Sequence, residues 1–180
     1  MVLGLDISTS CTGWCVFGEK DKFVDMGYVS LPSKLDVFDK VGKIKDLINK
    51  LVIRYEINEI FIEENLQAFR PGFSSAKTLM TLARFNGIIS YVCYDLLGIK
   101  PQYINVNSAR KKIGLKIDRK LDKTTKEQIL AWVTLDMSAY GYTYAWPQKT
   151  LKSGPRAGMT ILHPGCYDSA DAYVVCKASF

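Results

Sequence analysis

The stretch VLGLDIS at residues 2–8 decides the fold. Its apolar residues run almost without interruption up to Asp6, which is the pattern of a buried strand. Residues 9–13 are predicted to form a turn, and further strands are expected at 14–17 and 23–31 with a second turn between them. Two hairpins in succession make these three strands antiparallel neighbours.

Beyond residue 31, apolar residues recur every three or four positions. This pattern predicts helices over 35–51, 76–97, 123–137 and 168–178. Short strands at 59–64 and 103–106 alternate with them. The order β-β-β-α-β-α-β-α-α predicts a single α/β domain over residues 1–180, with a mixed sheet covered by helices. Residues 136–167 are rich in Gly and Pro, and we expect an extended loop there, either functional or mobile.

The composition is that of a globular protein with one sizeable core: 180 residues, 48% of them hydrophobic. No apolar run is long enough to span a membrane, and residues 1–6 lack the basic region that opens a signal peptide. The five cysteines are odd in number and widely spaced, which predicts buried, reduced thiols. We therefore expect a cytoplasmic protein without membrane contact.

The positive charge of the chain is concentrated in residues 110–126. This segment holds eight Lys or Arg against two Asp, which equals the formal net charge of +6 of the whole chain. Such a concentration is typical of a surface that binds a polyanion such as nucleic acid. A solvated loop and helix face is the alternative that charge alone leaves open.

Acidic residues fall at the ends of two predicted strands. Asp6 lies among apolar neighbours, where a carboxylate is costly unless it is paired or bound to metal; alternatively, it caps the turn that follows. Glu63 and Glu64 follow each other at the end of the strand at 59–64. Because side chains alternate along a strand, only one of the two can share a site with Asp6, and periodicity does not select which.

Two more acidic residues, Asp168 and Asp171, open the last predicted helix. Their spacing of three places them on one face, one turn apart. Asp168 is also a good N-cap candidate, an explanation that fits Asp171 less well. Three separate sources of semi-buried carboxylate suit a hard cation such as Mg²⁺, and a pair of such ions is a common device for cleaving phosphodiesters.

These motifs resemble those of the RuvC-like Holliday-junction resolvases, members of the RNase H-like nuclease superfamily. The opening strand and turn, GLDIS at 4–8 with TGW at 12–14, resembles the family's first acidic motif. IEEN at 62–65 looks like the second, with Asn65 where Gln is usual, and DSADA at 168–172 is similar to the third. The basic segments SARKK at 108–112 and KEQI at 126–129 stand where the family carries DNA-facing residues.

The resemblance implies an RNase H-like five-stranded sheet of order 3-2-1-4-5 and a homodimer that nicks four-way or other branched DNA junctions. Asp6, Glu63, Asp168 and Asp171 would hold two Mg²⁺ ions, for which Mn²⁺ would substitute; the alignment selects Glu63 over Glu64. DNA would contact a further set of residues: Ser8, Phe69, Phe73, Arg110, Lys111, Lys112 and Lys126. A bacterial or phage-infected cytoplasm would be the setting.

Alternatives remain at this stage. A non-catalytic branched-DNA-binding protein could use the same fold, although it would have no reason to retain four acids near DNA. An actin-like nucleotide hydrolase would need a second Gly-rich phosphate loop and about twice this length. The aromatic and basic residues of 136–167 would either stack on unpaired bases and grip phosphate or pack in the core. Phe69 or Phe73 would either wedge into the junction or pack on the dimer partner. His163, the only histidine, is expected to be structural.

Overall fold

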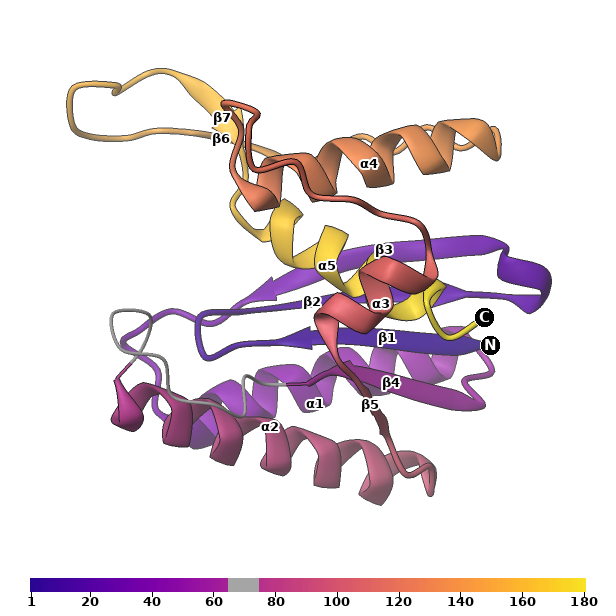
Figure 1. Ribbon diagram of the computed structural model, residues 1–180. Helices are drawn as coiled ribbons and strands as arrows, with labels where there is room; N and C mark the ends of the chain where they lie inside the picture. Colours follow the sequence, from indigo (N-terminus) through magenta and orange to yellow (C-terminus); the bar gives the residue numbers. More distant parts are fainter. Residues whose placement is uncertain (65–74) are drawn as a thin grey trace.

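A computed structural model describes residues 1–64 and 75–180 (Figure 1). Its main sheet has five strands: β1 (Val2–Ile7), β2 (Cys11–Phe17), β3 (Phe23–Ser30), β4 (Glu59–Glu63) and β5 (Gln102–Ile104). The strand order is β3-β2-β1-β4-β5, which confirms the predicted order. β1 pairs antiparallel with β2 and parallel with β4. Phe69 and Phe73 lie outside the described residues, so their predicted contacts stay predictions.

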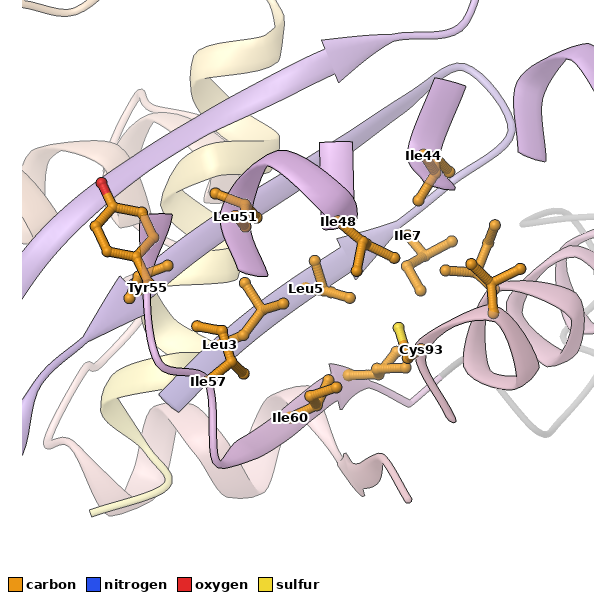
Figure 2. Close-up of a cluster of buried hydrophobic side chains, with 14 of the residues drawn as sticks. Leu3, Leu5, Ile7, Ile44, Ile48, Leu51, Tyr55, Ile57, Ile60 and Cys93 are labelled. Atoms are coloured by element: carbon orange, nitrogen blue, oxygen red, sulfur yellow. The ribbon is translucent and has the colours of Figure 1, made fainter. Parts of the chain in front are cut away.

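Helices cover both faces of this sheet. They are α1 (Val37–Arg54), α2 (Ala76–Leu97), α3 (Val106–Lys112), α4 (Thr125–Ala139) and α5 (Gly165–Lys177), with a 3-10 turn η1 (Glu19–Asp21) between β2 and β3. On one face, side chains of β1 and β4 pack against α1 and α2 in a core of aliphatic residues. Figure 2 shows Leu3 and Leu5 of β1 pointing toward Ile48 of α1 in this core. On the other face, α5 packs on the sheet, and α3 and α4 complete a second core with it.

Three predicted boundaries differ in the structure, and local capping accounts for the first two. The strand expected at 103–106 ends at Ile104, because the side chain of Asn105 accepts hydrogen bonds from the backbone N–H groups of Asn107 and Ser108 and starts α3. Thr124 forms a capping box with Glu127, so α4 runs two residues later than predicted at both ends. The last helix begins at Gly165, which places Asp168 inside the helix. The prediction that Asp168 serves as its N-cap is therefore wrong.

The unassigned segment 136–167 is structured. It contains the end of α4 and an antiparallel hairpin of β6 (Gln148–Thr150) and β7 (Thr160–Leu162). Three of its aromatic residues pack against the second core: the ring of Tyr142 meets Phe23 edge-on at 5.4 Å, and Tyr144 meets Trp146 at 4.9 Å. The packed alternative therefore describes these three rings, whereas Tyr140 is 56% exposed.

All five cysteines are unpaired and buried, as predicted. Across residues 1–64 and 75–180, no helix combines the length and the apolar character that crossing a membrane requires.

Candidate active site

The alternation of side chains along β1 and β4 decides where the first two acids point. Leu5 is paired in parallel register with Ile62, and both belong to the core beneath α1 and α2. The next residues along the two strands, Asp6 and Glu63, therefore point to the opposite face, which α5 covers. Glu64 follows the end of β4. The structure thus places Glu63, rather than Glu64, on the face of Asp6.

A glycine brings α5 close enough to complete the group. Gly13 of β2 is the register partner of Asp6, and a Cβ atom at Gly13 would collide with the backbone carbonyl of Asp168. Further along the same helix, a Cβ at Gly4 would lie 2.6 Å from the Cβ of Cys176. The missing side chains allow the helix backbone to lie directly on the sheet. The sequence predicted a turn at residues 9–13, and the structure instead places Gly13 within β2.

The four carboxylates lie within electrostatic reach of one another. Burial raises the pKa of Asp6 well above its ordinary value, and the charges of Glu63, Asp171 and Asp168 raise it further. Burial also raises the pKa of Glu63 to about 7 and that of Asp171 to about 6. Side chains from β1, β4 and α5 therefore form one buried acidic cluster, in which the anionic forms of Asp6, Glu63 and Asp171 are disfavoured until a cation neutralises the group.

Two cationic side chains approach this cluster. Lys126 Nζ lies 3.5 Å from Asp168 Oδ1, and Arg110 Nη2 lies 3.7 Å from Asp171 Oδ1. Burial by itself would lower the pKa of Lys126, but the carboxylates of the cluster outweigh it and raise that pKa. The Arg110 side chain is only 20% exposed. It was expected on the DNA-facing surface, and the structure instead places it against the acidic cluster.

The donor set fits a hard divalent cation. All four groups are carboxylates, and Asp171 Oδ1 is buried without a hydrogen-bond partner among the described residues. As they stand, no three His, Cys, Asp or Glu side chains within residues 1–64 and 75–180 surround one point closely enough to hold an ion. Asp168 and Asp171 are turned toward Lys126 and Arg110, so ion binding would require these pairs to loosen.

The remaining predicted residues fall into two groups. Ser8 is used inside the β1–β2 turn: its Oγ accepts from the N–H of Cys11 and donates to the Cys11 carbonyl at 2.7 Å. Ser8 therefore caps the turn, and the alternative role for Asp6 as that cap is wrong. The second group is exposed: Lys111 and Lys112 at the end of α3, and Lys126 at the start of α4.

A cleft of about 440 Å³ opens beside Lys126 and Asp168. Its far wall is His163, whose ring stacks on Tyr28 at 4.5 Å and whose Nδ1 accepts from the N–H of Gly165 at 3.1 Å. Burial lowers the pKa of His163, and the nearby charge of Lys149 lowers it further. The histidine thus packs and hydrogen-bonds within the fold, in keeping with the expected structural role, and it also lines the cleft beside Asp168.

No protein-family model matches the chain. Among curated proteins, the crossover junction endodeoxyribonuclease RuvC of Orientia tsutsugamushi (strain Boryong) is 28% identical over 120 residues, covering 62% of this chain and 74% of the relative. RuvC of Helicobacter pylori (strain G27) is 21% identical over 138 residues, covering 69% of this chain and 84% of the relative.

Two solved structures share the fold over 98% of this chain. T. thermophilus RuvC in complex with a Holliday junction substrate has a TM-score of 0.63 at 16% identity, with 90% of that chain covered. The yeast mitochondrial Holliday junction resolvase Ydc2 has a TM-score of 0.53 at 12% identity, with 76% covered. The sheet order and these matches define an RNase H-like α/β protein. Within that class, the chain is RuvC-like in both sequence and fold.

Proposed function

We propose that this protein is a structure-selective endonuclease that nicks four-way or other branched DNA junctions by metal-dependent phosphodiester hydrolysis. The observation that carries the proposal is the buried cluster of Asp6, Glu63, Asp168 and Asp171 beside an exposed basic surface. The cluster has the chemistry of a metal site, and the basic surface has the chemistry of a DNA site. The relatives with the same fold are named as junction endonucleases, and one was solved with a Holliday junction.

The four carboxylates would hold two Mg²⁺ ions, with Mn²⁺ as a substitute. When bound, such ions activate a water molecule and stabilise the leaving oxygen of a phosphodiester. Asp6 has electrostatic contact with all three other acids, which suits a ligand shared between the ions. Lys126, which lies 3.5 Å from Asp168, would offset negative charge on the phosphoryl oxygens. Arg110, which lies 3.7 Å from Asp171, would orient that carboxylate.

The DNA surface would extend from α3 to the start of α4. Lys111, Lys112 and Lys126 are exposed, and the loop between the helices adds four more exposed cations, Lys116, Arg119, Lys120 and Lys123. Contacts of this kind go to backbone phosphates and release counterions, so binding should weaken steeply as salt increases. Recognition would then depend on the shape of the junction more than on base sequence.

A homodimer would place two such sites on one junction. The outward face of α2 offers a surface for it, since Met80, Tyr91 and Tyr94 are 57%, 65% and 46% exposed. Ala83 and Gly87 lie on the same helical stripe and are exposed as well. Small and aromatic residues along one helix face allow close packing of a second helix.

Cleavage of a synthetic four-way junction in Mg²⁺ tests the proposal. The wild-type protein should produce paired nicks, EDTA should abolish them, and Mn²⁺ should restore them. Asp6→Asn should reduce the cleavage rate by about 10²–10³-fold or more, because a shared ligand is lost. Asp46→Asn, an exposed acid on α1, is the matched control and should cut normally. Undiminished cutting by Asp6→Asn would overturn the proposal.

Lys126 and Arg110 pair with carboxylates of the cluster. This pairing favours one alternative function, that of a branched-DNA-binding protein without catalysis. Such a protein would bind the junction yet cut nothing in either Mg²⁺ or Mn²⁺. Binding measured in EDTA beside cleavage measured in metal separates the two functions.

A further inference from the structure

The β6–β7 hairpin carries charge of only one sign. Residues 141–164 contain Lys149, Lys152 and Arg156 and no Asp or Glu. Lys152 and Arg156 lie in the loop that joins the two strands, and both are exposed. Figure 1 shows this loop projecting beyond the body of the fold at the end where α4 and α5 begin. The packed aromatic residues of this segment lie before the hairpin, so its tip is free for another partner.

The hairpin is held firmly to the element that carries two of the carboxylates. Its first strand follows Pro147, whose carbonyl accepts from the His163 N–H at 2.8 Å and from Cys166 Sγ at 3.2 Å. Trp146 Nε1 donates to Thr134 Oγ1 of α4 at 3.0 Å. The base of the hairpin is therefore tied to α4 and to the start of α5, and its direction is fixed relative to Asp168.

The loop itself is ordered by its own backbone. The Leu151 N–H donates to the Met159 carbonyl at 3.0 Å, and the Gly158 N–H donates back to the Leu151 carbonyl at 2.8 Å. Gly154 and Gly158 have φ values of +84° and +86°, which permit the two turns at the tip. Lys152 and Arg156 are thus presented on a built structure and not on a loose tail.

Basic side chains occur both at the active site and along this hairpin, and the cleft lined by the neutral His163 lies between them. Lys126 and His163 line one cleft, Lys149 acts electrostatically on His163, and Lys152 and Arg156 follow beyond it. We propose that the β6–β7 hairpin is a second DNA-binding element, which grips the phosphate backbone of a junction arm beyond the active site. The inference rests on the proposed function, because it assigns the hairpin to the same DNA substrate.

The salt dependence of junction binding tests this assignment. Affinity for a labelled four-way junction is measured in EDTA across a series of salt concentrations for the wild type and for Lys152→Gln/Arg156→Gln. Each phosphate contact contributes close to one unit to the slope of log K against log salt. The double variant should therefore bind roughly tenfold more weakly at low salt, with a slope shallower by about 2.

Lys43→Gln/Lys50→Gln on α1 is the matched control, since it removes the same charge from exposed positions distant from the hairpin. It should retain the wild-type slope. A hairpin variant that matches this control overturns the hairpin assignment, even where the wild type cleaves junctions normally. A change in self-association with an unchanged slope overturns it as well, because the tip would then meet a second copy of the chain.

The nuclease assignment and the hairpin assignment can be overturned independently of each other. If the wild type cuts no junction but its DNA binding still shows a slope that depends on Lys152 and Arg156, the hairpin contact stands and the nuclease assignment falls. If the wild type binds no DNA, both are overturned.

Discussion

At the scale of single residues, Gly13 links the fold to the site. It faces Asp6 across the β1–β2 pairing and lies against the backbone of Asp168. Any side chain at this position would push the start of α5 away from the sheet and separate Asp168 from Asp6. The positions of the carboxylates therefore depend on the absence of a Cβ atom at residue 13.

Gly13→Ala should destabilise the protein by about 1–3 kcal/mol, because backbone atoms cannot give way as a flexible side chain does. Gly42→Ala is the matched control: it lies on α1 with open space around its Cβ position and should instead stabilise by about 0.5–1 kcal/mol. Denaturant unfolding measures both. Equal effects from the two substitutions would contradict the close approach of α5.

In the proposed active site, Asp6 would serve metal binding at the expense of stability. Without a cation, Asp6 is buried among three other acids. Asp6→Asn should therefore raise the melting temperature of the metal-free protein, because a like-charge repulsion is removed. It should also abolish the additional stabilisation that Mg²⁺ gives the wild type through binding to the folded state.

Thermal unfolding with and without Mg²⁺ measures both effects, and Asp46→Asn should behave as the wild type. If Mg²⁺ raised the melting temperature equally in the wild type and in Asp6→Asn, the ion would bind elsewhere.

At the scale of elements, α2 is the helix that the sequence predicted without error. Ser75 caps its start by accepting from the Thr78 N–H, and Gly98 ends it at a φ of +69°. Both signals are local, so periodicity and capping chemistry were sufficient. Its outward stripe has no covering element in the described part of the chain, which is the basis for the proposed dimer.

Tyr91→Glu should dissociate that dimer, because it buries a charge in the centre of the stripe. Light scattering coupled to size-exclusion chromatography measures the mass, and paired nicking of a junction should become single nicking. Ile53→Glu, an equally apolar and highly exposed site on α1, is the control and should leave the mass unchanged. A monomeric wild type would contradict the dimer directly.

At the scale of the whole molecule, buried tyrosine hydroxyls hold distant elements together. Tyr55 at the end of α1 donates to Asp25 of β3 at 2.7 Å, and Tyr173 of α5 donates to Asp136 of α4 at 2.7 Å. Burial raises the pKa of Tyr55 and of Tyr144 to about 12, and it raises the pKa of Tyr173 as well. These hydroxyls must stay protonated in the folded state.

The free energy of unfolding should therefore fall between about pH 10 and pH 12. In this range the unfolded chain releases tyrosine protons that the folded chain retains, so rising pH favours unfolding. Denaturant titrations at successive pH values measure the stability, and tyrosinate absorbance follows ionisation. In Tyr55→Phe, the free energy of unfolding should fall less steeply with pH. A stability that stays constant over this range would contradict the prediction.

The sequence by itself determined the five strands of the main sheet, the helices α1, α2, α4 and α5, and their order. The buried strand at residues 2–8, the two hairpins and the helical periods are local properties, and the acidic and basic motifs were visible in them. The hairpin at β6 and β7 and helix α3 were missed, because three-residue strands and a seven-residue helix give too short a pattern to recognise.

Only the tertiary structure decided which residues meet. It supplied the physical reason for Glu63 over Glu64, a choice that the family resemblance also made: the parallel register with β1 fixes the face that each side chain takes. It moved Arg110 from the expected DNA surface to the carboxylates and assigned the turn cap to Ser8. It also separated the packed aromatic rings of 136–167 from the exposed cations at the hairpin tip. These choices depend on contacts between segments far apart in the chain, which no local pattern records.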